Sequence, residues 1–143
     1  MVATVLSVSK ATKRFGGLVA VNNLSFDVNS DEVMGIIGPN GSGKTTMMNL
    51  ISGALRLSEG SISLDGQFIS SLTANQINQR GIARTFQLVR ILPSLTVVEN
   101  CMAGMVFGHR RIWGAQARYE AGKLIVRVGL SGKEAVPVGS LTD

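Results

Sequence analysis

The chain has 143 residues, of which 14 are basic and 9 acidic, giving a formal net charge of +5, and 45% are hydrophobic. A chain of this length can bury roughly two-thirds of the surface that its unfolded form exposes, so a hydrophobic core is possible. The basic residues are spread along the sequence, whereas a nucleic-acid-binding domain usually gathers them on one face. The composition therefore favours a globular domain with a mildly basic surface and no nucleic-acid partner.

The cysteine content and the hydropathy of the chain exclude further classes of protein. Cys101 is the only cysteine, which excludes an internal disulfide and fits a reducing compartment. No stretch reaches the roughly 18 consecutive apolar residues that indicate a membrane-spanning helix. The first residues lack the basic and then apolar pattern of a secretory signal peptide. We therefore expect a protein of a reducing compartment, with neither a signal peptide nor a membrane-spanning helix.

The first third of the chain predicts strands followed by a helix. Residues 4–9 and 20–28 alternate apolar and polar side chains, which predicts two strands joined around residues 15–17. The almost wholly apolar run 33–37 predicts a strand buried on both faces. A glycine-rich turn follows, and a helix is then expected from Lys44 to about Gly53.

The rest of the chain mixes a hairpin with helices. Asp65-Gly66 is a strong tight-turn pair, and Thr96 and Glu99 have the spacing of a capping box that opens a helix. The expected elements are a hairpin at 61–69, a short helix at 73–80, a strand at 81–86, helices at 96–107 and 113–128, and a loop at 131–143. This order predicts an α/β fold with an antiparallel β flank.

One segment carries a complete phosphate-binding motif, G-x-x-x-x-G-K-[ST], formed by Gly38, Pro39, Asn40, Gly41, Ser42, Gly43, Lys44 and Thr45. Glycines allow backbone angles closed to other residues, so that successive N–H groups can surround a phosphate. The following helix adds its free N–H groups and a partial positive charge. Because the motif lies between an apolar run and a helical run, the sequence predicts a nucleotide-binding P-loop.

The motif assigns individual roles for ATP and Mg²⁺. Lys44 is expected to reach the β- and γ-phosphates and to support catalysis. The hydroxyl of Thr45 is expected to ligate Mg²⁺, which prefers oxygen ligands, and Thr46 can donate to the α-phosphate. Many enzyme families share a P-loop, so this motif alone does not identify one.

Residues on both sides of the P-loop resemble those of ABC-type ATPases. The stretch 13–22, Lys-Arg-Phe-Gly-Gly-Leu-Val-Ala-Val-Asn, resembles the opening of that family, and Phe15 matches the aromatic residue that stacks on adenine. Arg84-Thr85-Phe86-Gln87 resembles the strand that leads into the family's Q-loop. The resemblance implies that Gln87 helps to hold Mg²⁺ and the attacking water and senses the membrane subunits.

Further sequence motifs, including Leu-Thr-Val-Val-Glu-Asn at 95–100, are similar to those of the ATP-binding subunits of branched-chain amino acid importers. The ATPases of urea and related amide importers share many of these motifs, so this subgroup remains an alternative. The resemblance implies three partners: a second ATP-binding subunit, transmembrane permease subunits and, indirectly, a periplasmic or extracellular solute-binding protein. It also implies a peripheral location at the cytoplasmic face of the cell membrane.

The chain also departs from the family. Leu141-Thr142-Asp143 could begin the family's signature sequence, but no apolar run ends in Asp-Glu, and His109 is misplaced for the switch histidine. We therefore expect an ABC-type P-loop core at 1–87 and an incomplete helical subdomain at 88–143, truncated before the signature and Walker B. Such a fragment binds ATP at most and does not hydrolyse it.

Two other classes remain open. A stand-alone small nucleotide-binding module would be a stable monomer without exposed sheet edges. A phosphotransferase would need an acceptor site with its own catalytic base and arginines. Arg80, Arg84 and Arg90 are candidates, but Arg84 and Arg90 are more simply explained as flanks of the Q-loop region.

Overall fold

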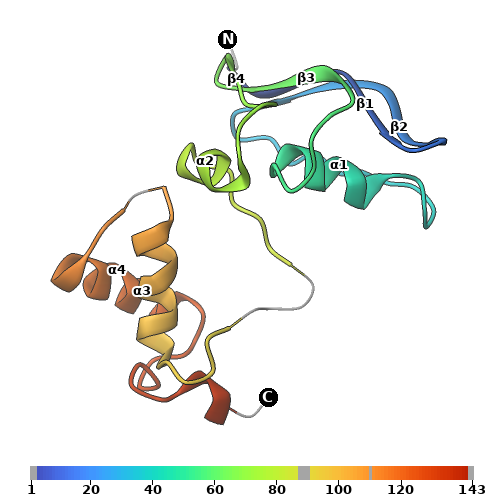
Figure 1. Cartoon of the computed structure of the whole chain (residues 1–143). Helices are drawn as coiled ribbons and strands as arrows, with labels where there is room; N and C mark the ends of the chain where they lie inside the picture. Colours follow the sequence, from blue (N-terminus) through green and yellow to red (C-terminus); the bar gives the residue numbers. More distant parts are fainter. Residues whose placement is uncertain (1–2, 87–90, 110, 142–143) are drawn as a thin grey trace. The chain divides into compact units, whose positions relative to one another are not determined.

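The computed structural model describes residues 3–86, 91–109 and 111–141. The chain divides into two compact units, one ending at Ile77 and the other beginning at Asn78, whose elements are labelled in Figure 1. The functional division expected between residues 87 and 88 remains a prediction. No helix in the described ranges is long and apolar enough to cross a membrane.

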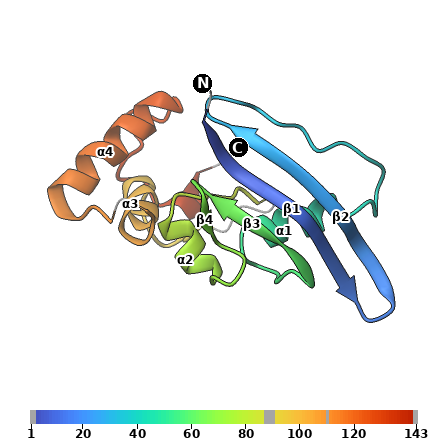
Figure 2. The same cartoon turned by 90° about the horizontal axis from the view of Figure 1, so that it is seen from above.

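The first unit is built on an antiparallel sheet of four strands in the order β2-β1-β3-β4 (Figure 2). These are β1 (Thr4–Phe15), β2 (Leu18–Asn29), β3 (Glu59–Leu64) and β4 (Gln67–Phe68). Both predicted hairpins are therefore confirmed, and the first has longer strands than the alternation indicated. Asp65 and Gly66 have positive φ of 47° and 74°, as a tight two-residue turn requires.

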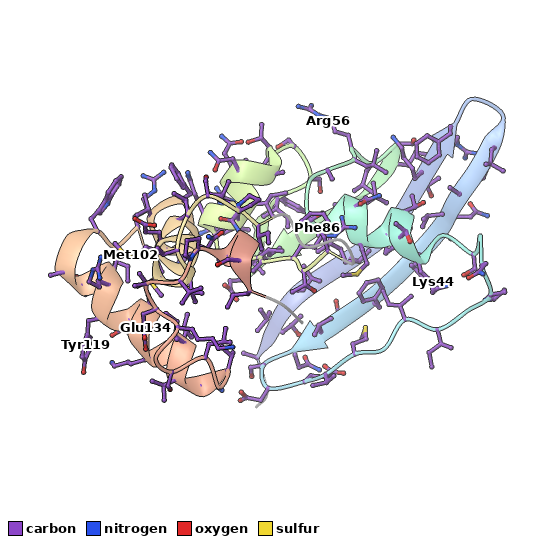
Figure 3. All side chains as sticks on the ribbon, turned by 90° about the horizontal axis from the view of Figure 1, so that it is seen from below. Lys44, Arg56, Phe86, Met102, Tyr119 and Glu134 are labelled. Atoms are coloured by element: carbon purple, nitrogen blue, oxygen red, sulfur yellow. The ribbon has the colours of Figure 1, made fainter. Side chains whose placement is uncertain are left out.

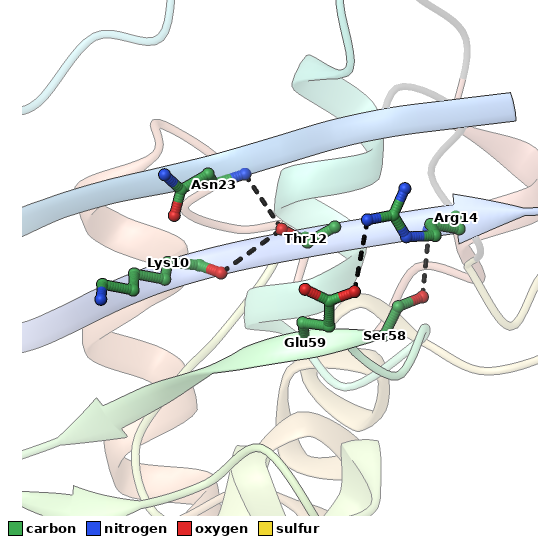
Figure 4. Close-up of polar contacts among 6 residues, drawn as sticks. All are labelled: Lys10, Thr12, Arg14, Asn23, Ser58 and Glu59. Atoms are coloured by element: carbon green, nitrogen blue, oxygen red, sulfur yellow. Dashed lines mark hydrogen bonds and ion pairs between the residues drawn. The ribbon is translucent and has the colours of Figure 1, made fainter.

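An irregularity in β1 is held together by polar groups from both neighbouring strands (Figure 4). Lys10 has a φ of 49°, and the buried Thr12 hydroxyl accepts the Asn23 N–H at 3.0 Å. Gly60, with a φ of 88°, lies so close to the Lys10 carbonyl that a Cβ would collide with it. The sheet thus bends where β2, β1 and β3 run side by side.

Helix α1 (Lys44–Ile51) lies below this sheet in the view of Figure 1. It buries Met47 and Leu50, and Gly53 follows it with a φ of 72°, as expected just after a helix C-terminus. Helix α2 (Ala74–Gln79) confirms the short helix predicted there. The buried apolar residues of this unit are Val8, Ala11, Val21, Met47, Leu50, Ile62, Ile69 and Ile77.

Two strand predictions are wrong. Residues 33–37 form no strand, and Val33 and Ile37 are 99% and 96% exposed. Residues 81–86 form no strand either. A strand exists only where neighbours accept and donate its main-chain hydrogen bonds, and the sheet of the described chain offers neither segment a partner.

The second unit packs α3 (Val97–Phe107) against α4 (Gly114–Arg127), and the 3₁₀ helix η1 (Val138–Ser140) follows. Both predicted helices are confirmed, and so is the capping box of Thr96 and Glu99. The C-terminal loop is confirmed over its described part except for that one 3₁₀ turn. The core of this unit consists of Val97, Val98, Ala121 and Ile125, with Cys101, Met102, Met105, Leu130, Val138 and Leu141 packed around it.

Candidate nucleotide-binding site

The glycine-rich segment 38–43 leads directly into α1. Gly41 and Gly43 have φ of 82° and 89°, a region that side chains rarely adopt. A Cβ on Gly43 would also collide with the carbonyl oxygen of Ala20 in β2. Both constraints make glycine necessary at residue 43, which fixes how the loop enters the helix.

The N-terminus of α1 is open to an anion. Its N-cap residue is Gly43, so no side chain caps it, and its first turn contains no acidic residue. The first N–H groups of a helix have no partner within the helix and carry the positive end of its dipole. The loop therefore presents donors and positive potential where the motif predicts a phosphate.

Lys44 folds back over this loop. Its Nζ donates to the carbonyl oxygens of Gly38 and Pro39, each at 2.7 Å, and the residue is half-buried at the start of α1 (Figure 3). The flexible stem thereby holds a full positive charge beside the open helix terminus. The arrangement can stabilise several negative charges in one place.

The neighbouring hydroxyls fit a magnesium site of the usual kind. Thr45 is exposed and Thr46 half-buried, both in the first turn of α1. The described residues contain no cluster of three or more His, Cys, Asp or Glu side chains. Mg²⁺ commonly takes one or two protein ligands and completes its shell with phosphate oxygens and water, so one hydroxyl beside a phosphate cradle suits it.

Phe15 closes β1 at the turn into β2 and is 45% exposed. The Nζ of Lys13 lies 5.0 Å from the centroid of its ring, within the range of a cation–π contact. The ring is thus accessible and carries a cation on one side. Its assignment to the adenine base remains a prediction.

Gln87 lies outside the described residues. Just before it, Phe86 is 62% exposed, and the guanidinium carbon of Arg84 lies 4.8 Å from the centroid of its ring. Phe86 is labelled in Figure 3. The metal-binding and water-positioning roles of Gln87 stay predictions.

The sequence alone predicted no role for Asn100, although its side-chain amide bonds to the turn before α3. Its Oδ1 accepts the N–H of Leu92, and the two N–H bonds of its Nδ2 are shared among the carbonyl oxygens of Leu92, Leu95 and Thr96. Its position inside a predicted helix is the sequence feature that points to Asn100. Asparagine disfavours helix interiors because its amide competes for main-chain groups. An asparagine directly after the capping-box glutamate is therefore unexpected unless its amide bonds to the main chain.

A sheet flanking a P-loop and its helix defines a nucleotide-binding α/β protein. The model of the family described as ABC transporter matches residues 21–142. The chain belongs to the ABC transporter family.

Curated relatives indicate the subgroup. The chain is 43% identical over 108 residues to the high-affinity branched-chain amino acid transport ATP-binding protein BraF of Pseudomonas aeruginosa, covering 76% of this chain and 41% of that protein. It is also 43% identical over 97 residues to LivG of Escherichia coli K12, of the same description, covering 68% and 38%. The matched region is thus about two-fifths of each relative's length.

Solved structures agree on the fold. The crystal structure of the ADP conformation of an ATP-binding cassette of an ABC transporter gives a TM-score of 0.84 at 29% identity, covering 97% of this chain and 59% of that one. A nucleotide-free cassette gives a TM-score of 0.80 with the same identity and coverage. The chain therefore has the fold of part of an ABC cassette.

Proposed function

We propose that this chain binds ATP with Mg²⁺ and belongs to the ATP-binding subunit of an ABC importer for branched-chain amino acids. Lys44, held across the P-loop at an open helix terminus, is the observation that carries the nucleotide part. The transport part rests on relatives named as branched-chain amino acid transport ATP-binding proteins. These names favour it over a urea or amide importer and over a stand-alone nucleotide-binding module.

Each predicted site residue has a place in this proposal. The phosphates lie against the loop formed by Gly38, Pro39, Asn40, Gly41, Ser42 and Gly43, in which every residue except Pro39 carries a main-chain N–H. Lys44 turns from its two carbonyls to the β- and γ-phosphates, since hydrogen bonds between ions are stronger than those to neutral carbonyls. Thr45 holds Mg²⁺, Thr46 donates to the α-phosphate, and Phe15 covers the base.

The partners and location follow from the proposed importer. A second ATP-binding subunit pairs with this one, permease subunits bind it at the cytoplasmic face of the membrane, and a solute-binding protein acts indirectly. Residues 1–87 supply the nucleotide-binding core and residues 88–143 the beginning of the helical subdomain. Gln87, the last residue of the proposed core, helps to hold Mg²⁺ and the attacking water.

The 143-residue chain itself is expected to bind ATP without measurable hydrolysis. Phosphoryl transfer to water needs a group that positions the water, in addition to the metal and the phosphate cradle. No apolar run in this sequence ends in the Asp-Glu pair that supplies such a carboxylate in the family. Phosphate release from MgATP, measured on the same samples as binding, tests this expectation.

Fluorescence anisotropy with a fluorescent ATP analogue and Mg²⁺ tests the binding proposal. Lys44→Ala should weaken binding about 10- to 100-fold, because hydrogen bonds between charged groups contribute roughly 1.5–3 kcal/mol. Lys133→Ala is the matched control, because this exposed lysine lies in the other unit, and it should bind as the parent does. Equal affinity of the parent and Lys44→Ala would refute the proposed site.

A further inference from the structure

The ammonium group of Lys13 is held beside the ring of Phe15 by a main-chain acceptor. Its Nζ donates to the carbonyl oxygen of Arg56 at 2.8 Å and lies 5.0 Å from the centroid of the ring. Both of these partners are uncharged, whereas the neighbouring Arg14 is paired with the carboxylate of Glu59 at 3.3 Å. In its two contacts, therefore, no carboxylate neutralises the charge that Lys13 brings to the ring.

The carbonyl of Arg56 that accepts this bond is fixed on both sides. The N–H of the preceding residue donates to the carbonyl of Asn49 in α1 at 3.0 Å. On the other side, the N–H of Ser58 donates to the carbonyl of Thr12 in β1 at 2.9 Å. Because the acceptor is held between α1 and β1, the ammonium group of Lys13 has a defined position over the ring.

The Lys13–Phe15 contact and the phosphate loop lie on neighbouring parts of the first unit. Lys13 faces Val21 across the β1–β2 pair. A Cβ on Gly43 would lie 3.4 Å from Cγ2 of Val21, so the end of the loop packs on the same part of β2. A base stacked on the ring and phosphates bound by the loop can thus belong to one nucleotide.

The cation determines which face of the Phe15 ring a base can use. The faces of aromatic rings carry negative potential, which attracts cations and opposes direct face-to-face stacking of two rings. A cation over one face draws the ring electrons toward itself, and this reduces the repulsion of a second ring on the opposite face. The cation also holds the ring in place, so that less side-chain ordering opposes the binding of a base.

We propose that Lys13 is a positioning residue for the nucleotide base: its ammonium group, anchored on the Arg56 carbonyl, covers one face of Phe15 and directs the purine to the other face. The inference rests on the proposed nucleotide site and on Phe15 as the base contact. Lys13 acts through the ring and touches neither the base nor the phosphates.

Isothermal titration calorimetry of the 143-residue chain with MgATP and with magnesium ribose 5-triphosphate tests this role. The second ligand carries the same triphosphate and has a hydroxyl in place of the base, so the ratio of the two affinities measures the contribution of the base. In the parent, MgATP should bind about tenfold tighter, within the range for one base stacked on an aromatic side chain. Phe15→Ala should reduce this ratio to about one.

The variant Lys13→Gln keeps a donor for the Arg56 carbonyl and removes the charge. It should lower the ratio about threefold, as expected for a cation–π contact at a partly exposed site, and keep the affinity for ribose 5-triphosphate within about twofold of the parent. Lys13→Arg retains a cation that binds aromatic faces and should keep the ratio. Lys10→Gln is the matched control and should change neither affinity, because this exposed lysine of the same strand lies outside the contact with Phe15.

Two further measurements separate the base contact from mere stability. Lys13→Gln added to Phe15→Ala should lower the ratio no further, because Lys13 acts through the ring. In the MgATP complex of the parent, nuclear Overhauser effects should join the Phe15 ring protons both to the Lys13 side chain and to the adenine protons. This second measurement decides the question if Lys13→Gln does not fold. A purely structural Lys13 would weaken both ligands equally and leave the ratio unchanged.

The outcomes distinguish this role from the proposed function. A ratio that falls in Lys13→Gln and is kept in Lys13→Arg and Lys10→Gln supports the proposal. A ratio that is unchanged in Lys13→Gln or falls equally in either of the other two variants overturns it while the proposed nucleotide site stands, and so does a complex in which the adenine displaces Lys13 from the ring. Equal affinity of the parent for both ligands overturns Phe15 as the base contact, and Lys13 with it. A parent that binds neither ligand overturns the proposed function.

Discussion

The ammonium group of Lys44 donates to two main-chain carbonyls, so a bound nucleotide must displace them before it can bind this group. A phosphate oxygen has to replace the carbonyls of Gly38 and Pro39 around Nζ. Hydrogen bonds between oppositely charged groups are roughly twice as strong as neutral ones, so the exchange favours the phosphate. The sequence predicted the identity of Lys44 but not these contacts, because a four-carbon side chain has many allowed rotamers.

Gly43 is the most constrained residue of the loop and supports a stability prediction. Gly43→Ala places a side chain at a φ of 89° and against the Ala20 carbonyl, so it should destabilise the first unit by about 2 kcal/mol. Gly17→Ala is the control, because Gly17 has open space around it and no positive φ, and it should change stability by about 0.5 kcal/mol or less. Urea unfolding followed by circular dichroism compares the two; equal midpoints would show that the loop is not held as described.

The elements that the sequence predicted correctly are those with local determinants. The Asp65-Gly66 turn, the Thr96 capping box and the glycine after α1 all act over a few residues, and all three are present in the structure. The runs 33–37 and 81–86 failed as strands because a strand depends on partners distant in the sequence. An apolar composition indicates that a segment favours burial. It does not indicate that a neighbouring strand is present to pair with it.

The cap of α3 gives a prediction for pH dependence. The main-chain N–H of Thr96 donates to the Glu99 carboxylate at 2.8 Å, and this bond, followed by the Thr96 hydroxyl, lowers the pKa of Glu99 below its ordinary 4.5. A carboxylate with a lower pKa in the folded state stabilises that state above its unfolded pKa, and the stabilisation is lost as the pH falls through the folded value. Glu134 has a lowered pKa through main-chain hydrogen bonds and adds to the same trend.

The variant Glu99→Gln separates the pH-dependent stabilisation by Glu99 from that of the other carboxylates. The parent should lose stability in the second unit as the pH falls below about 4.5, and Glu99→Gln should lose less over the same range because its amide does not titrate. The fluorescence of Trp113, the only tryptophan, reports on this unit during unfolding. Identical pH profiles for the two proteins would show that the cap does not depend on the charge of Glu99.

The whole chain agrees with its relatives over the part it shares with them. It has the fold of part of a cassette, at a TM-score of 0.84, and spans about two-fifths of the length of two curated branched-chain amino acid transport ATP-binding proteins. The P-loop position, the antiparallel flank and the family could all be inferred from the sequence. The order β2-β1-β3-β4 could not, because alternation of side chains does not specify which strand pairs with which.

In the second unit, main-chain hydrogen bonds pair segment 92–98 with segment 134–139. The sequence did not predict this pairing, for a related reason. It is made by main-chain groups, which every residue carries, and Asn100, which also bonds to segment 92–98, uses only main-chain partners there. Residue types therefore reveal the glycine-rich loop, where glycine and lysine are required, and do not reveal contacts that main-chain groups make.

Nuclear magnetic resonance of the ¹⁵N-labelled chain during titration with MgATP tests the central claim most directly. If the loop amides form the phosphate site, the largest and saturable shifts should fall on the amides of Asn40 to Thr46, and Lys44→Ala should abolish them at the same nucleotide concentration. Unchanged loop amides, or saturable shifts confined to other parts of the chain, would contradict the account.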